Sequence, residues 1–321
     1  MSFLTVCLNP TLQKTLRFSS IIPGTVNRTD THRLDVSGKG INVSRVLSQL
    51  GKKVIHLTQL GGVMRPLFLS LCEKDSLAVE WAESNSAIRF CYTLITDTGN
   101  IENNVTELVE ESEPVGADTC KHLLDKFDAL LPGSDCLIIS GTKAAGFPDT
   151  TIPLMVQKAK KRDMTVILDV RGKDLIESLR YRPDIIKPNL FEFALTFAPE
   201  LIKNNDLLED EDTVRKQISA LSVEMCKKYQ CRVILTRGAR PVWAAEHDNF
   251  FEVSHTAVKP LNSTGSGDAF TAGLAAALEN GANFSAAISE GIRCGSLNAR
   301  CFKPGVIKTR TLSLAKARLH P

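Results

Sequence analysis

The chain has 321 residues, of which 43% are hydrophobic, so it is long enough to bury a large core in one or two domains. Its 39 basic and 36 acidic side chains leave a net charge of only +3, too weak a bias to indicate a nucleic-acid partner. The nine cysteines form no Cys-x-x-Cys pair, and their odd number argues against a disulfide framework or a zinc site. Without a basic leader or an apolar run of 18 residues, we expect a cytoplasmic protein with no membrane partner.

Short apolar strands and amphipathic helices alternate along the chain. We expect strands at residues 4–8, 54–60, 136–140, 165–169, 185–187 and 232–237. Helical periodicity predicts helices at residues 42–50, 67–74, 119–130, 151–162, 175–179 and 213–229. Residues 88–97 and 101–107, joined by the turn Thr98-Gly99-Asn100, are typical of a hairpin. This order predicts an α/β fold with a mainly parallel sheet covered by helices on both faces.

Polar residues stand at the ends of four predicted strands. Ser140 and Asp169 each end a strand, and Lys187 and Arg237 end two more. In an open α/β sheet, ligands bind at the carboxyl ends of the strands. We therefore expect these four side chains at one ligand site.

Residues 261–270 carry the most specific chemistry. Gly265, Ser266 and Gly267 precede Asp268 at the start of an apolar helix, where backbone N–H groups and the helix dipole attract an anion. A carboxylate beside a phosphate is repulsive unless it binds a metal or takes a proton from an attacking hydroxyl. A helix N-cap would explain Asp268 equally well, and this segment alone leaves both interpretations open.

A second glycine-rich loop lies near the N-terminus. Gly38, Lys39 and Gly40 precede Asn42 on an amphipathic helix that ends at Gly51. Two anion-binding helix starts in one chain suggest two ligands. No G-x-x-x-x-G-K-[ST] spacing occurs, so neither loop is a P-loop.

Together these loops resemble the two signature regions of the ribokinase/PfkB sugar-kinase family, a GGKG-N motif and a D-T-x-G-A-G-D motif. Lys187-Pro188-Asn189 with Glu192 resembles the KPN-x-x-E element of that family. Asn9-Pro10, Arg28 and Arg89 narrow the resemblance to the branch with 1-phosphofructokinase, tagatose-6-phosphate kinase and the minor 6-phosphofructokinase. The resemblance implies a single ribokinase-like domain over residues 1–321, with a small β lid at about 11–34 and 89–108, and a homodimer formed through that lid.

The resemblance also implies a role for each matching residue. Asp268 is expected to be the general base, beside an anion hole formed by Gly265, Ser266 and Gly267. The acceptor, a small sugar phosphate, is expected to contact Gln13, Arg28, Gly38, Lys39, Gly40, Asn42, Arg89 and Ser140. ATP, the expected phosphoryl donor, is assigned to Lys187, Thr236, Arg237, Gly238 and Asn298. Asn189 and Glu192 are expected to orient Mg²⁺ through water.

Several of these residues also have an ordinary structural explanation. Asn189 and Glu192 also have the spacing of a helix-capping pair, Arg28 and Arg89 could be solvated lid residues, and Asn298 could be ordinary surface polarity.

Three departures from the branch pattern leave the sugar open. Ser37 replaces the first glycine of the usual pair, Gln13 stands where the branch has Asp, and Thr93 occupies a position that is Lys in 1-phosphofructokinases. Gln can donate or accept a hydrogen bond but cannot supply a carboxylate's charge. We predict an ATP-dependent kinase of a ketohexose phosphate. The alternatives are a kinase of an unphosphorylated sugar or nucleoside, and a non-catalytic sugar-phosphate-binding regulator on the same scaffold.

Overall fold

The computed structural model of the chain describes residues 2–97, 104–204, 206–208 and 210–307. The predicted turn Thr98-Gly99-Asn100 and the first residues of the predicted return strand lie outside these ranges. Among the described helices, none combines the length and the hydropathy needed to cross a membrane.

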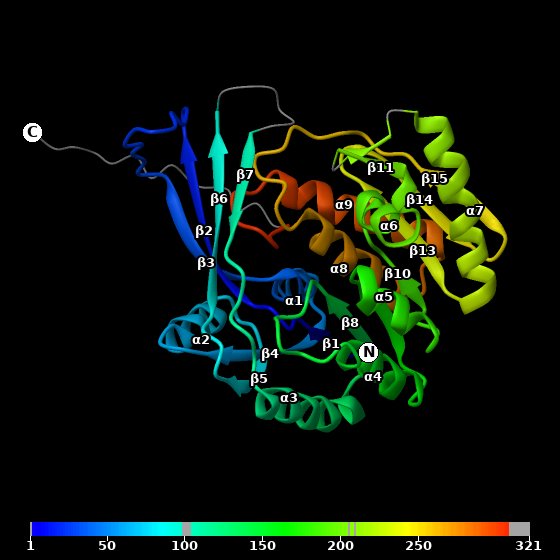
Figure 1. Cartoon of the computed structure of the whole chain (residues 1–321), viewed down its shortest axis with the longest axis horizontal. Coiled ribbons are helices and arrows are strands. Elements are labelled where there is room, and N and C mark those ends of the chain that lie inside the picture. The colour runs from blue at the N-terminus through cyan, green and yellow to red at the C-terminus, as the bar shows by residue number, and fades with distance from the viewer. Residues whose placement is uncertain (1, 98–103, 205, 209, 308–321) are drawn as a thin grey trace, which may run out of the picture.

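A nine-stranded sheet forms the centre of the chain (Figure 1). Its strand order is β15-β14-β13-β10-β9-β8-β1-β4-β5. The strands are β1 (Ser2–Val6), β4 (Lys53–Gly61), β5 (Val79–Ser84), β8 (Cys136–Ser140), β9 (Thr165–Asp169), β10 (Ile185–Ile186), β13 (Arg232–Arg237), β14 (Arg240–Glu246) and β15 (Asn249–Val253). Neighbours from β13 to β5 are parallel, and β14 and β15 extend one edge as an antiparallel hairpin.

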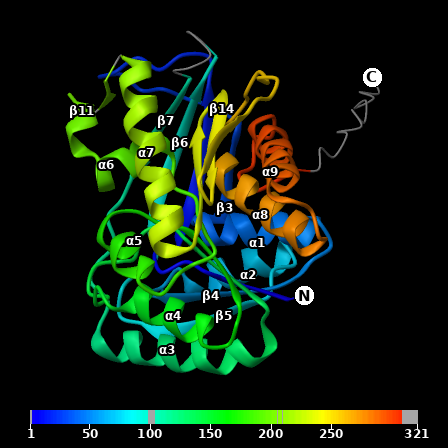
Figure 2. The ribbon, with the colours of Figure 1, turned by 90° about the vertical axis from the view of Figure 1, so that its right-hand side faces the viewer.

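Helices cover both faces of this sheet because strand side chains alternate between two apolar layers. Ile138 and Ile167 pack toward α1 (Lys39–Gln49), α8 (Ser266–Glu279) and α9 (Phe284–Ala299). Leu137 and Leu168 pack toward α3 (Ala117–Leu130), α4 (Thr151–Lys160), α5 (Gly172–Leu179), α6 (Leu190–Phe197) and α7 (Glu211–Tyr229). Figure 2 shows α8 beside α1, with α9 packed against α8. The predicted α/β fold with a mainly parallel sheet is confirmed.

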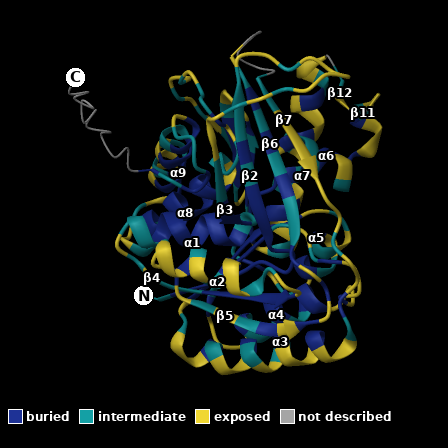
Figure 3. Cartoon of the chain, turned by 90° about the vertical axis from the view of Figure 1, so that its left-hand side faces the viewer, coloured by how far each residue is buried: buried dark blue, intermediate teal, exposed yellow. Residues whose placement is uncertain are grey.

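A separate four-stranded sheet forms the lid, in the order β3-β2-β6-β7. Its strands are β2 (Thr11–Phe18), β3 (His32–Ser37), β6 (Arg89–Thr96) and β7 (Val105–Val109). Strands β2 and β6 pair in parallel, and the other neighbours are antiparallel. Helix α2 (Arg65–Lys74) packs beneath the lid through Phe68 and Cys72. Figure 3 shows that β2 is more buried than β7.

The remaining short elements lie outside these layers. They are the 3₁₀ turns η2 (Leu131–Gly133) and η3 (Pro199–Leu201) and the two-stranded pair β11 (Ile202–Lys203) and β12 (Asp206–Leu207). Strand β5 and the β14–β15 hairpin were absent from the predicted elements. Helix α1 begins at Lys39, three residues before the predicted start, which brings Asn42 into its first turn.

Candidate active site

The parallel register brings the predicted site residues to one edge of the sheet. Ser140 lies directly opposite Asp169, the last residue of β9. Lys187 follows β10, and its backbone N–H donates to the Leu168 carbonyl at 2.8 Å. The expectation that ligand-binding side chains gather at these carboxyl ends is met by Ser140, Asp169 and Lys187.

Asp169 lies between two lysines. Its oxygens are 3.2 Å from Lys187 Nζ and 3.5 Å from Lys39 Nζ. Burial alone would raise the pKa of Asp169, but the two ammonium groups hold it below its usual value. Asp169 in turn raises the pKa of Lys39, with a further contribution from Glu192, whose Oε1 is 3.4 Å from Lys39 Nζ. The site therefore holds two fixed positive charges.

The loop before α8 has the backbone geometry of an anion site. Gly265 has φ of +81°, and a Cβ there would lie 3.1 Å from the backbone nitrogen of Gly305, so only glycine fits. The Ser266 N–H is used within the turn, where it donates to the Ser263 carbonyl at 3.0 Å. The predicted anion hole therefore depends on the amides that follow Ser266 in the first turn, which have no carbonyl partner within the helix.

Asp268 is a buried carboxylate in the first turn of α8. Asn42 Nδ2 donates to its Oδ2 at 2.8 Å, which joins the two glycine-rich segments of the sequence. Burial raises the pKa of Asp268 to about 6, with a further increase from Asp169, while Lys39, Asn42 and Lys187 oppose the rise. Such a carboxylate is ionised at neutral pH and more basic than an exposed one. The N-cap alternative does not hold, since Gly265 occupies that position.

Gly38 and Gly40 let the start of α1 approach β1 closely. Gly38 is the N-cap of α1, with φ of +110°. A Cβ on Gly40 would come within 2.9 Å of Cys7 Cβ and 3.0 Å of the Val6 carbonyl oxygen. Because Gly38 and Gly40 have no side chains, Lys39 and Asn42 lie close to the edge of the sheet where Asp268 is.

Asn298 is fully buried, so the surface-polarity interpretation of it is wrong, while its nucleotide role stays a prediction. Its Nδ2 donates to the Thr264 carbonyl at 2.9 Å and to Ser266 Oγ at 3.1 Å. Its Oδ1 accepts from Gly305 N–H at 2.6 Å and Val306 N–H at 3.3 Å. It fixes the anion loop to residues 301–307, which we call the C-terminal strap.

The side chain of Arg237 packs on an aromatic ring and pairs with carboxylates. Its guanidinium lies 3.8 Å from the centre of the Trp243 ring and pairs with Glu211. Its Nη1 is 3.9 Å from Glu252. These contacts engage part of the guanidinium, and its Nε is buried without a hydrogen-bond partner, so the role of nucleotide-phosphate ligand stays a prediction.

The backbone near Arg237 remains in place for such a role. Thr236 forms a bridge with Asn189, so the end of β13 lies beside the Lys187-Pro188-Asn189 element. Gly238, with φ of +63°, makes the exposed turn into β14.

Asn189 and Glu192 form a capping box at the start of α6. Asn189 Oδ1 accepts from Glu192 N–H at 2.7 Å, and Glu192 Oε2 accepts from Asn189 N–H at 3.1 Å. The capping alternative is therefore confirmed. Oxygen donors suit Mg²⁺, but with one amide and one carboxylate already bonded, the pair fits only contact through water. Its metal role stays a prediction.

Gln13 is buried on β2 and is no solvated loop residue. Its Nε2 donates to Thr93 Oγ1 on β6 at 2.6 Å. Two of the three departures from the branch pattern thus touch each other, because Gln13 pairs with Cys91 in register and Thr93 lies two residues farther on the same face.

Unpartnered polar atoms surround the acceptor side. Thr11 pairs with both Ser37 and Arg89, which sets Arg89 across β2 from the start of the Gly38 loop. Within the described residues, Arg89 Nε, Ser140 Oγ and Asn9 Oδ1 are buried and have no hydrogen-bond partner. Unsatisfied buried polar atoms are costly, so these three atoms are available to bond a ligand.

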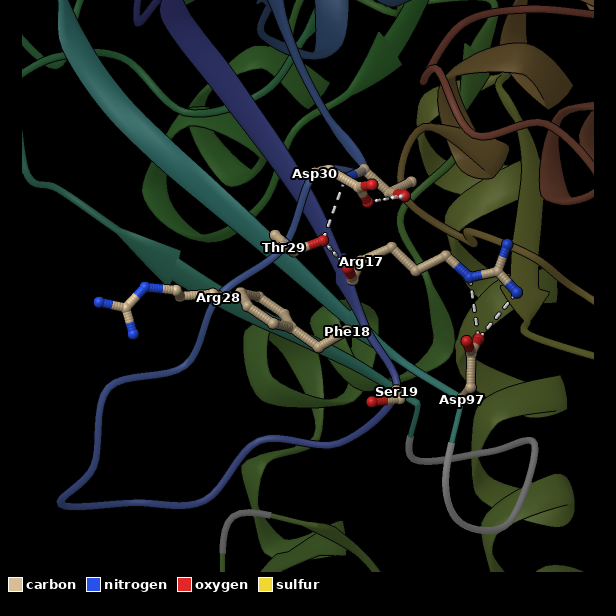
Figure 4. Close-up of a pocket in the computed structure, with 8 residues that line it drawn as sticks. Arg17, Phe18, Ser19, Arg28, Thr29, Asp30 and Asp97 are labelled. Atoms are coloured by element: carbon tan, nitrogen blue, oxygen red, sulfur yellow. Dashed lines mark hydrogen bonds and ion pairs between the residues drawn. The ribbon is translucent and has the colours of Figure 1, made fainter. Parts of the chain in front are cut away.

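Arg28 lies apart from Arg89. It is an exposed residue of the loop between β2 and β3, and Figure 4 shows it beside Arg17 and Phe18, pointing away from them. Arg89 is paired with Thr11, whereas Arg17 is six residues farther along β2, about 20 Å at the usual rise per residue. Within one chain, the two arginines do not converge on one phosphate.

Sequence reasoning placed Asp169 at the ligand site without a chemical role, and it gave Asn9 no role of its own. Asp169 had the right signal, a carboxylate at a strand end, but its ion pairs with Lys39 and Lys187 join residues 130 and 18 positions away. Asn9 belongs to the Asn9-Pro10 segment, and its only sign of a ligand contact is a buried side-chain oxygen without a hydrogen-bond partner.

Comparison with known proteins bears on the family and the fold of the chain. The model of the pfkB family of carbohydrate kinases matches residues 6–309. Escherichia coli phosphofructokinase-2, solved in complex with fructose-6-phosphate, is 21% identical with a TM-score of 0.79, covering 92% of this chain and 93% of that one.

Two proteins from Thermotoga maritima are similar as well. A possible 1-phosphofructokinase is 22% identical with a TM-score of 0.81, covering 94% of this chain and 93% of that one. A ribokinase is 18% identical with a TM-score of 0.69 and 95% coverage of both. These structures share the ribokinase-like fold, and because the family model spans most of the sequence, we conclude that this chain belongs to the pfkB family of carbohydrate kinases.

Proposed function

We propose that this chain transfers the γ-phosphoryl group of ATP to a hydroxyl of a sugar phosphate, most simply a ketohexose phosphate. The observation that carries the proposal is the position of Asp268: a buried, unusually basic carboxylate in the first turn of a helix that opens with an anion loop. A carboxylate there suits proton removal from an acceptor while the helix start holds the transferring group.

The reaction can be written with these residues. The acceptor oxygen attacks the γ-phosphorus, its proton passes to Asp268, and the bond to the β–γ bridging oxygen breaks to release ADP. Lys39 and Lys187, fixed by Asp169, lie where they can stabilise charge on the transferred oxygens. Mg²⁺, held mainly by nucleotide phosphates with Asn189 and Glu192 contacting its water ligands, would neutralise further phosphate charge. Thr236 and Gly238 are proposed to contact the nucleotide through their backbone.

Arg89 and Ser140 are proposed to bind the phosphate that the acceptor already carries. Arg89 Nε and Ser140 Oγ are buried without partners, and a phosphate oxygen would satisfy both. The neighbour solved with fructose-6-phosphate supports a sugar phosphate as the acceptor class. Gln13, held by Thr93, is proposed to meet a sugar hydroxyl.

The proposed kinase is a homodimer that associates through the lid. Leu16, Tyr92, Leu94 and Leu108 alternate with the Gln13 face of the lid strands and remain half-buried or exposed. The base of this opposite face packs against α2 through Leu12 and Phe90, so only its outer part is available. Because Arg28 and Arg89 do not converge within one chain, we propose that Arg28 contacts an acceptor phosphate only across this interface.

The proposed activity predicts ATP-dependent ADP release with one class of acceptor. In a panel of free sugars, hexose 6-phosphates, ketose 1-phosphates and nucleosides, we expect turnover only with phosphorylated sugars. A coupled ADP assay measures it. Turnover only with free sugars or nucleosides would contradict the acceptor class, and tight sugar-phosphate binding without turnover would instead support a regulator.

Removing the base should abolish most turnover. We expect Asp268→Asn to lower kcat by about 10²–10⁴, the usual contribution of a positioned base, with ATP affinity nearly unchanged. A base must be ionised, so wild-type kcat/KM should fall on the acid side with a midpoint near pH 6. Steady-state kinetics across pH checks both. Near-normal turnover of the folded variant would remove Asp268 from the mechanism.

Arg89→Ala should raise the KM of the phosphorylated acceptor by about 10-fold or more, since a hydrogen bond to a charged group contributes about 1.5–3 kcal/mol. The KM of ATP should hardly change. Arg17→Ala is the matched control, because Arg17 is an exposed lid arginine paired with Asp97 at the far end of β2. An equal effect of both variants would argue that Arg89 supports the lid generally.

Gln13→Asp should change acceptor preference. The carboxylate restores the branch-typical charge and loses the amide donor to Thr93, so relative kcat/KM among ketohexose phosphates should shift by about 10-fold. Competition assays with paired acceptors measure the ratio, and Thr93→Val is the control that removes the Thr93 hydroxyl alone. An unchanged preference in Gln13→Asp would show that Gln13 does not meet the sugar.

A further inference from the structure

Asn42 donates to the proposed base with one end of its amide and is held at the other end. Its Nδ2 is 2.8 Å from Asp268 Oδ2, and its Oδ1 is 2.9 Å from Arg45 Nη1. The hydroxyl of Ser37 lies 3.5 Å from the same Oδ1. The two ends of one amide thus connect a carboxylate to a guanidinium.

This arrangement permits only one orientation of the amide. A guanidinium has N–H donors and no acceptor, so Asn42 must present its oxygen to Arg45 and its NH₂ to Asp268. A flipped amide would set two donors against each other at Arg45 and two oxygens against each other at Asp268. Arg45 therefore holds the amide in the orientation that the carboxylate also requires, with the NH₂ facing Asp268.

Arg45 is itself fixed in place from three sides. It is only 4% exposed, and its Nε donates to Asp75 Oδ2 at 2.9 Å. Nη2 donates to the Val36 carbonyl at 2.7 Å, and Nη1 also reaches the Pro304 carbonyl of the C-terminal strap at 3.1 Å. The guanidinium nitrogens thus donate to partners that lie in several directions. A lysine has a single ammonium group and cannot reach all of these partners.

We propose that Arg45 is a positioning residue that orients the Asn42 amide and so sets the basicity of Asp268. This inference rests on the proposed function for the role of Asp268 as the base. The hydrogen bonds that join Arg45, Asn42 and Asp268 do not depend on that function. A hydrogen bond donated to the ionised form of a carboxyl favours that form and lowers its pKa. Loss of Arg45 should therefore raise the pKa of Asp268.

Other charged or titratable groups face Asp268 and must be separated from this effect. They are Asp169 at the end of β9, Lys39 at the start of α1, Lys187 after β10, and the Cys7 thiol after β1. Arg45 reaches Asp268 through Asn42, so its influence should disappear when Asn42 is absent, whereas a direct charge effect would persist.

The test compares Arg45→Met with wild type by two measurements. With ¹³C-labelled aspartate, the side-chain signal that Asp268→Asn removes gives the pKa of Asp268 directly, and kcat/KM across pH gives the acid midpoint. We expect both to move upward by about one pH unit, the size expected when a hydrogen bond to the charged form is lost. In an Asn42→Ala background, Arg45→Met should cause no further shift in the ¹³C titration.

Two further variants separate positioning from folding. Lys303→Met removes a charge that pairs with Asp35 and Asp75 but leaves the Arg45–Asn42 bond, so it should lower thermal stability without moving the Asp268 titration. If Arg45→Met does not fold, Arg45→Lys decides, since its ammonium stays beside Asp75 and should still move the titration upward.

An Asp268 titration unchanged in the folded Arg45 variant would overturn the inference, as would an equal Arg45→Met shift in the Asn42→Ala background. If wild type phosphorylates nothing in the panel, the proposed function fails, while the ¹³C titration still tests the role of Arg45.

Discussion

The candidate site depends on the burial of Asp268 among charges that partly compensate one another. A carboxylate removed from water is destabilised in its ionised form, and only nearby donors and cations keep it usable as a base. Asn42 supplies the donor, while Lys39 and Lys187 supply the cations. Asp169 holds those lysines, so one buried carboxylate positions the charges that act on the other.

This constraint explains why distant parts of the chain converge on one edge of the sheet. The parallel strands bring Ser140, Asp169 and Lys187 together, and the glycine-rich starts of α1 and α8 bring Asn42 and Asp268 into contact. The C-terminal strap contacts both of these segments. Gly305 N–H donates to Asn298, which bonds the loop before α8, and the Pro304 carbonyl accepts from Arg45 of α1. Because the donors are held before substrate arrives, little reorganisation is needed during phosphoryl transfer.

Local patterns in the sequence predicted the features that depend on local chemistry. Apolar strands alternating with amphipathic helices gave the parallel sheet, and the two glycine-rich helix starts marked the centre of the site. The β14–β15 hairpin was missed because residues 240–246 include Pro and four small or charged side chains at an edge where pairing, not composition, makes the strand.

The contacts that sequence reasoning did not predict join residues far apart in the chain. Arg237 and Asn298 stood at positions where relatives suggest nucleotide contacts, and in the fold Trp243 and Glu211 contact the first, while the anion loop and the strap contact the second. Arg28 and Arg89 both lie in the lid, and only strand register shows that they are at opposite ends of it. Gln13 and Thr93 were separate departures in the sequence, whereas the fold makes them one hydrogen-bonded pair.

A crystal structure of the chain with a non-hydrolysable ATP analogue and a ketohexose phosphate would test the central claim most directly. The account predicts that the acceptor hydroxyl lies about 3 Å from an Asp268 oxygen, within hydrogen-bond distance, with the γ-phosphate at the start of α8. A hydroxyl bonded instead to Asp169 or Glu192, or a γ-phosphate away from the Gly265 loop, would contradict it.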